Sequence, residues 1–162
     1  MAAGGLSAVT VEGLARALGV TKGSFYWHFT DRAALLTAVL DTWQQRTEDI
    51  IAGTQSHATV ARARLAHLAD VTLSGDGLAA ELAIREWARH DTQVGVRLRR
   101  VDDRRMQYLR SLFGEFCSGS DEIEARSMLL YSLRMGDYFI AARHGRKSRQ
   151  HVLQCALAHL LR

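Results

Sequence analysis

The sequence predicts an all-α fold, because three features favour helices over strands. The chain has no proline among its 162 residues, so no residue of this kind interrupts a long helix. Hydrophobic residues make up 48% of the chain and recur at helical spacing rather than in the alternating pattern of strands. Glycine, serine, threonine and aspartate gather between these segments, where they can form turns.

Composition limits where such a chain can act. No run of about 18 apolar residues is present, so the sequence predicts no membrane span and no membrane partner. Met1–Gly5 lacks the basic and apolar regions of a signal peptide. Two cysteines, Cys117 and Cys155, are too few for a disulfide scaffold and fit a reducing compartment. We therefore expect a cytoplasmic protein.

The N-terminal segment predicts a helix-turn-helix. The apolar residues of its first helix lie at helical spacing: Leu14, Ala15 and Leu18. Gly19 can adopt the left-handed conformation that a tight turn needs, and Thr21 is a good N-cap for the second helix. We expect Val20 to fill the corner between the two helices. In this motif the second helix enters the DNA major groove.

The second helix divides its residues between anchoring and DNA contact. Phe25 and Phe29 are four residues apart and can hold one face against the protein. The residues expected at base edges stand at its N-terminal end: Lys22, Gly23 and Ser24. Those expected at phosphates carry a donor group: Tyr26, Trp27, His28 and Arg32. Thr10 and Thr21 complete the predicted DNA contacts. The alternative, that the aromatic residues only fill a small core, is disfavoured because three consecutive helical residues cannot all face inward.

These residues resemble the signature of the TetR family of bacterial transcriptional regulators. The segment GVTKGSFYWHF at 19–29, followed by the basic Arg32 and the pair Leu35-Leu36, matches the family's pattern of a short helix ending in Tyr-x-His-Phe. A weaker resemblance covers Glu81–Phe116, which is similar to ligand-domain helices of one branch of the family. The family opens with a full helix before the motif, whereas Ala2–Leu6 resembles only the end of such a helix. We therefore expect that first helix to be incomplete here.

The remaining sequence predicts six further helices. Thr30 is expected to cap the first of them, with Asp31 in its first turn, and Gly53 to end it. A pair at i, i+4, Glu81 and Arg85, is expected in the third. The predicted spans are about Asp31–Ala52, Thr59–Leu73, Leu78–His90, Thr92–Cys117, Ile123–Arg143 and Ser148–Leu161. We divide the chain into a helix-turn-helix domain, 1–40, and a helical ligand-binding and dimerisation domain, 41–162.

The last two helices predict a homodimer. Ile123–Arg143 is apolar almost all round, and a helix of this kind is buried from more than one direction. The resemblance implies the same, because TetR regulators dimerise through their last two helices. The residues expected at the interface are Leu133, Val152, Leu153, Ala156, Leu157 and Leu160.

A small-molecule site can also be predicted, although each of its residues is by itself more typical of a core. Aromatic and methionine side chains on three helices could enclose a pocket with an apolar lining and a few polar tips. They are Trp87, Met106, Tyr108, Phe113, Met128, Tyr131, Met135 and Tyr138. Such a lining suggests an apolar or aromatic effector of unknown identity.

Other groups of residues favour a structural interpretation. Six arginines between Arg97 and Arg110 could form a second nucleic-acid patch, but Asp102 and Asp103 interrupt it, which is typical of a salt-bridged surface. The spacing of His151, Cys155 and His159 would suit a metal, yet it favours the edge of an interface. No nucleophile, phosphate-loop or dinucleotide motif is present, so we predict no enzyme, no cofactor and no metal.

Charge alone does not indicate the function. The net charge is +4, yet residues 1–53 hold four basic and five acidic side chains. Together, the motif and the resemblance predict a homodimeric regulator that binds double-stranded operator DNA, most simply a repressor released by its effector. The alternative is a helical small-molecule-binding dimer that no longer binds DNA.

Overall fold

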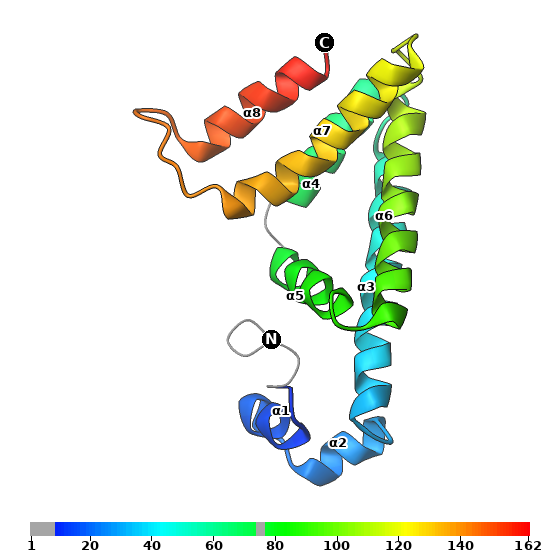
Figure 1. Ribbon diagram of the computed structural model, residues 1–162, viewed down its shortest axis with the longest axis vertical. Helices are drawn as coiled ribbons and strands as arrows, with labels where there is room; N and C mark the ends of the chain where they lie inside the picture. The colour runs from blue at the N-terminus through cyan, green and yellow to red at the C-terminus, as the bar shows by residue number, and fades with distance from the viewer. Residues whose placement is uncertain (1–8, 74–76) are drawn as a thin grey trace. The chain divides into compact units, whose positions relative to one another are not determined.

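The computed structural model of the chain describes residues 9–73 and 77–162, and every regular element in these ranges is an α-helix. This confirms the predicted all-α class. In chain order the helices are α1 (Val11–Leu18), α2 (Lys22–His28), α3 (Arg32–His57), α4 (Ala61–Leu73), α5 (Leu78–Ala88), α6 (Thr92–Phe113), α7 (Ser120–Phe139) and α8 (Arg149–Leu160) (Figure 1).

Contacts between residues group these helices into two compact units. The first unit consists of the described residues of Met1–Glu48 together with Gly77–Val101. The second unit consists of the described residues of Asp49–Asp76 together with Asp102–Arg162. α3 and α6 therefore contribute residues to both units, and the predicted domain boundary after residue 40 stays a prediction.

The turn between α1 and α2 has the predicted chemistry. Gly19 adopts a left-handed conformation with φ of 67°, and its N–H and that of Val20 donate to carbonyl groups of the last turn of α1. The Thr21 hydroxyl accepts a hydrogen bond of 3.2 Å from the backbone N–H of Ser24, so Thr21 caps α2. The prediction for Val20 is wrong. Its side chain is 45% exposed and lines an open cavity, so it does not fill the corner between the helices.

The first unit has a small core that α3, α5 and α6 share. Its buried hydrophobic residues are Leu40, Trp43, Ile84, Val94 and Val101. A buried carboxylate stands beside them: Glu81 accepts a hydrogen bond of 2.8 Å from Trp43 Nε1 and one of 3.0 Å from Arg85 Nε. The predicted pair of Glu81 and Arg85 is therefore confirmed, with the Glu81 carboxylate buried and the Arg85 side chain partly exposed.

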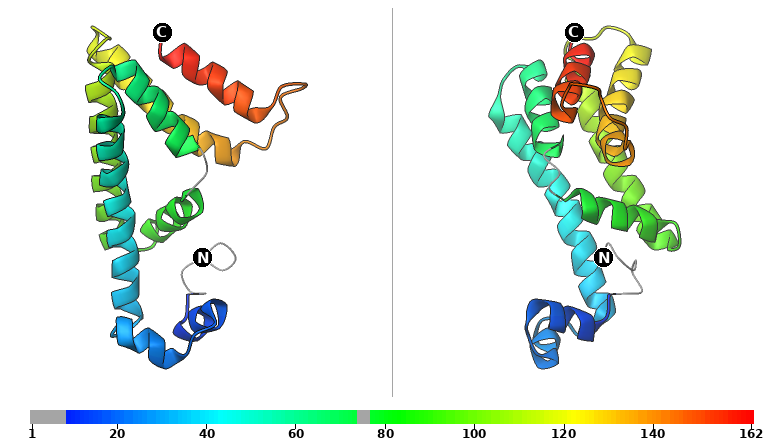
Figure 2. Two further views of the ribbon diagram at one scale, coloured as in Figure 1. Left: turned by 180° about the vertical axis from the view of Figure 1, so that it is seen from behind. Right: turned by 90° about the vertical axis from the view of Figure 1, so that its left-hand side faces the viewer.

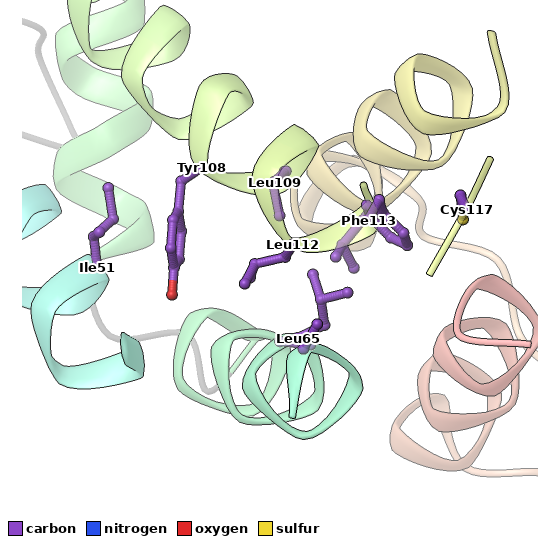
Figure 3. Close-up of a cluster of buried hydrophobic side chains, with 10 residues drawn as sticks. Ile51, Leu65, Tyr108, Leu109, Leu112, Phe113 and Cys117 are labelled. Carbon is purple, nitrogen blue, oxygen red and sulfur yellow. The ribbon is translucent and has the colours of Figure 1, made fainter. Parts of the chain in front are cut away.

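The second unit has a larger core, drawn in Figure 3. Tyr108, Leu112 and Phe113 of α6 face Leu65 of α4, and Ile51 of α3 lies beside them. α7 packs against α4 and α8, as both views of Figure 2 show. α8 has no fully buried residue, because only one side of this helix packs against the core of the unit, through apolar side chains such as Leu157 and Leu160.

Several predicted helix ends are wrong, and α3 shows why. It begins after Asp31, whose side chain accepts a hydrogen bond of 2.7 Å from the N–H of Ala34, so Asp31 and not Thr30 is the cap. It then continues past Gly53 to His57. A glycine inside a helix costs only about 1 kcal/mol, and burial of Ile51 and Thr54 on either side of it favours the helical conformation.

The ends of α6 and α7 also differ from the prediction. α6 ends at Phe113 rather than Cys117, and Gly114 follows it. α7 begins at Ser120 and ends at Phe139, four residues before the predicted end at Arg143. In the described chain α7 keeps several large apolar side chains exposed near its C-terminal end, so continuing the helix would bury little more.

Candidate nucleic-acid interface

α2 buries one aromatic residue and exposes the next two. Phe25 is buried, and its ring lies 5.5 Å from that of Phe29, so these two side chains anchor the helix. Tyr26 is 57% exposed and Trp27 is 82% exposed, and the ring of His28 is exposed as well. The alternative in which these aromatic residues fill a core is therefore wrong, because exposed rings do not contribute to one.

The residues predicted at base edges are also accessible. Lys22, Gly23 and Ser24 form the first turn of α2 and are exposed. A Cβ atom added to Gly23 would meet only the Thr21 hydroxyl, at an ordinary contact distance of 3.6 Å. The Lys22 ammonium is paired with the carboxylate of Glu12 on α1, at 2.5 Å. This hydrogen bond to Lys22, helped by the backbone N–H of Glu12, lowers the pKa of the Glu12 carboxyl below its usual value.

The other predicted DNA contacts have structural partners within the protein. Thr10 and Thr21 accept hydrogen bonds from the backbone at the starts of α1 and α2. Each hydroxyl still has a proton that it can donate to a phosphate. Arg32 is half-buried, and its Nε–H donates a hydrogen bond of 2.6 Å to the backbone carbonyl of Val9. Arg32 thus ties the segment before α1 to the first turn of α3, and its contact with phosphate stays a prediction.

An apolar cavity of about 780 Å³ lies among α1, α2 and the start of α3. Six of the side chains that line it are Leu14, Leu18, Val20, Phe25, Leu35 and Leu36. Leu18 is 72% exposed, so the apolar stripe predicted for α1 is only partly covered by the described residues. The predicted end of a preceding helix at Ala2–Leu6 lies outside those residues.

The predicted effector residues are distributed over different environments. Tyr108 and Phe113 are buried in the core of the second unit, with Met106 and Tyr131 packed against it. Trp87 packs against the core of the first unit. Met135 is half-buried, whereas Met128 and Tyr138 are exposed. A pocket formed by these residues stays a prediction.

Two tyrosine hydroxyls on the predicted list differ in their partners. The Tyr131 hydroxyl donates a hydrogen bond of 2.6 Å to the carboxylate of Asp102 and accepts one of 3.0 Å from the guanidinium of Arg105. It therefore belongs to a polar cluster between α6 and α7. The hydroxyl of Tyr108 points away from α6 (Figure 3) and has no hydrogen-bond partner among the described residues. Burial raises the pKa of Tyr108. Of the two, Tyr108 has the unused donor.

The predicted dimer residues are half-buried rather than fully exposed. Leu157 and Leu160 pack against the core of the second unit. Leu133 and the other predicted residues of α8, which are Val152, Leu153 and Ala156, are half-buried too. Five large apolar side chains at or after the middle of α7 are more exposed: Met128, Leu129, Tyr138, Phe139 and Ile140. An apolar surface is therefore present beside the predicted residues.

The arginine-rich part of α6 is a salt-bridged surface, as predicted. Arg97 pairs with Asp41 at 2.6 Å, and Arg110 makes two hydrogen bonds with Glu124. His151 and Cys155 lie 3.6 Å apart on the exposed side of α8. Within residues 9–73 and 77–162, no three histidine, cysteine or acidic side chains are grouped so as to hold a metal ion. No helix in the same ranges is both long enough and apolar enough to cross a membrane.

Comparison with known sequences finds regulators of transcription. Residues 1–39 match the family described as bacterial regulatory proteins, tetR family. Over 56 residues the chain is 32% identical to the HTH-type transcriptional regulator TtgR of Pseudomonas putida, a match that covers 35% of this chain and 27% of that protein. Over 52 residues it is 33% identical to the probable HTH-type transcriptional regulator ArpR, also of Pseudomonas putida, covering 32% and 25%. The matches thus span about a quarter of these curated relatives.

Comparison with solved structures shows the same fold over nearly the whole chain. AibR, solved in complex with isovaleryl coenzyme A and operator DNA, superposes with a TM-score of 0.70 at 13% identity, covering 96% of this chain and 88% of that one. A transcriptional regulator of the TetR/AcrR family from Thermobifida fusca superposes with a TM-score of 0.64 at 17% identity. This match covers 96% of the present chain and 86% of the Thermobifida chain. The two curated relatives are both named as regulators of transcription. Residues 1–39 thus match the tetR family of bacterial regulatory proteins, and the chain as a whole shares the fold of these solved regulators.

Proposed function

We propose that the chain is a transcriptional regulator that binds double-stranded operator DNA through α2. The observation that carries this proposal is the pairing of a buried anchor with exposed neighbours: Phe25 is buried, while Tyr26 and Trp27 are exposed next to it. Exposed side chains with donor groups can bond phosphate oxygens, and the first turn of the helix then faces base edges. Such a regulator would act in the cytoplasm.

We further propose that it binds DNA as a homodimer through α7 and α8. The large apolar side chains exposed on α7 and just after it support this, because apolar surface left exposed on a protein commonly marks an interaction site. A two-fold dimer presents two α2 helices to two half-sites, whose centres must lie roughly 34–36 Å apart on DNA.

Release by a small apolar or aromatic effector completes the proposed mechanism. A repressor of this kind would bind its effector among helices of the second unit and change the spacing of the two α2 helices. Support comes from the shared fold with AibR, which was solved with both an acyl coenzyme A and operator DNA. The aromatic and methionine side chains around Tyr108 and Tyr131 suit an apolar ligand.

Fluorescence anisotropy with labelled duplex DNA tests the DNA-binding part. Lys22→Ala should weaken binding, since it removes a cation from the proposed interface. Lys147→Ala removes the other lysine of the chain, which lies between α7 and α8, and should leave binding unchanged. Equal affinities for the wild-type protein and both variants would contradict the assignment of α2.

A further inference from the structure

The two helices of the helix-turn-helix are joined by an ion pair at the edge expected to face DNA. Lys22 Nζ lies 2.5 Å from Glu12 Oε1, and the two side chains are 57% and 56% exposed. Lys22 is the first residue of α2, and Glu12 is in the first turn of α1. The contact therefore connects a residue predicted to read bases with an acidic residue for which the sequence indicated no function.

Glu12 differs in sign from the other charged residues of this segment. Between Val11 and His28 it is the one acidic residue, and the basic residues are Arg16 and Lys22, besides His28. Cancelling the charge of Lys22 therefore removes a large part of the positive charge that these two helices could bring to the phosphate backbone. Sequence-independent binding to DNA depends on that charge, because each phosphate neutralised releases counterions.

The pair does not use all the donors of Lys22. A lysine ammonium has three N–H donors, so one bond to Glu12 leaves two for other acceptors. Guanine offers two acceptors, O6 and N7, side by side in the major groove. A carboxylate at one side of the ammonium also restricts the positions that the flexible lysine side chain can take.

We propose that Glu12 is a specificity-determining residue, which neutralises Lys22 toward phosphates while holding its ammonium toward base edges. This inference rests on the proposed function, and it adds a residue on α1 to a reading surface otherwise confined to α2. In complexes with unrelated DNA, the paired lysine adds no net charge. In the specific complex, Lys22 bonds a base and keeps Glu12 as a partner.

The decisive variant is Glu12→Gln, which keeps the shape of the side chain and removes its charge. Binding to short duplexes of random sequence should strengthen by about 3- to 10-fold at about 50 mM salt, because one more cation becomes available to phosphates. The slope of log affinity against log salt should become steeper by about 0.9. Binding to a sequence enriched by in vitro selection should change less, so the ratio of specific to random affinity should fall.

A matched control is Glu124→Gln. Glu124 is also an exposed glutamate paired with a basic side chain, that of Arg110, and the pKa of its carboxyl is lowered mainly by that side-chain hydrogen bond. It lies in the second unit, away from α1 and α2 in the sequence. This variant changes the net charge of the protein by the same amount as Glu12→Gln. It should leave the affinity for random DNA, the affinity for the selected sequence and the ratio of the two unchanged.

A double-mutant cycle separates pairing from simple repulsion between Glu12 and DNA. In a Lys22→Met background, Glu12→Gln should strengthen binding to random DNA less than it does in the wild-type background, because only the repulsion between Glu12 and phosphates is then relieved. The same gain in both backgrounds would overturn the proposal, because Glu12 would then act directly on phosphates. No gain in the wild-type background, or an unchanged specificity ratio, would overturn it as well.

A measurement without DNA distinguishes failure of this inference from failure of the proposed function. NMR titration should give a pKa for the Glu12 carboxyl that rises when Lys22 is replaced by methionine, because the lysine now lowers it. An unchanged pKa would overturn the pairing even in a protein that binds DNA. A rise in pKa, in a protein with no affinity for any DNA, would instead reject the proposed function and its specificity role.

Discussion

The indole Nε1–H of Trp43 donates a hydrogen bond of 2.8 Å to Oε2 of Glu81, 38 residues further along the chain. Glu81 is 1% exposed, and its other oxygen is held by Arg85 at 3.0 Å. A buried carboxylate is costly unless it is paired and hydrogen-bonded. The bond therefore fixes how α3 and α5 pack within the first unit.

We expect Trp43→Phe to destabilise the protein by about 1.5–3 kcal/mol, because the variant keeps an aromatic ring but removes a donor to a buried charge. Urea unfolding followed by circular dichroism measures the change. Trp27→Phe is the matched control, since Trp27 is 82% exposed and its replacement should cost less than about 0.5 kcal/mol. Equal urea midpoints of unfolding for the two variants would show that the hydrogen bond from Trp43 to Glu81 contributes little to the stability of the protein.

Two glycines that lie in open space should respond to alanine in opposite directions. Nothing lies within 4 Å of a Cβ added at Gly19 or at Gly53. Gly19 has φ of 67°, so Gly19→Ala should cost about 1–2 kcal/mol through the left-handed conformation alone. Gly53 is inside α3, so Gly53→Ala should stabilise by about 0.5–1 kcal/mol. The thermal midpoints of the two variants check this, and shifts of the same sign would contradict it.

Tyr26 is expected to hold a phosphate without reading sequence. Tyr26→Phe removes only the hydroxyl and should weaken binding by about 0.5–1.5 kcal/mol. The loss should be the same for random duplexes and for a selected sequence, because phosphates carry no sequence information. Anisotropy titrations of both DNAs measure it. A loss confined to the selected sequence would place Tyr26 at a base instead.

A charge in the proposed dimer interface should separate the subunits. Leu133→Asp puts a carboxylate on the half-buried side of α7, whereas Ser132→Asp puts the same charge on its exposed side. Sedimentation at micromolar concentration should give a monomer or aggregate for the first variant and a dimer for the second. A stable monomer of the wild-type chain would remove the basis of this prediction.

Local chemistry made the helix-turn-helix predictable. The φ of Gly19 and the cap at Thr21 depend on residues within one turn of each position, so the sequence is sufficient to identify them. The end of α3 was not predictable in this way. Burial of Ile51 and Thr54, to which distant residues contribute, outweighs the low helix propensity of Gly53.

Pairs between helices were beyond the reach of sequence spacing. Glu12 and Lys22 are ten positions apart and meet only because the turn at Gly19 brings α1 against α2. Glu81 was expected as the partner of Arg85, which the i, i+4 spacing indicates. Its burial and its bond to Trp43 depend on the packing of α5 on α3, which no local pattern encodes.

In vitro selection from a pool of random duplexes, run in parallel with the wild-type protein and Lys22→Ala, shows directly whether α2 reads operator DNA. The wild-type protein should enrich an inverted repeat whose half-site centres are separated by roughly 34–36 Å. Lys22→Ala should relax the preference at one or two base pairs in each half-site, each worth about 1–3 kcal/mol of binding free energy. No enriched sequence for the wild-type protein, or an identical preference for the variant, would contradict the claim that α2 reads operator DNA.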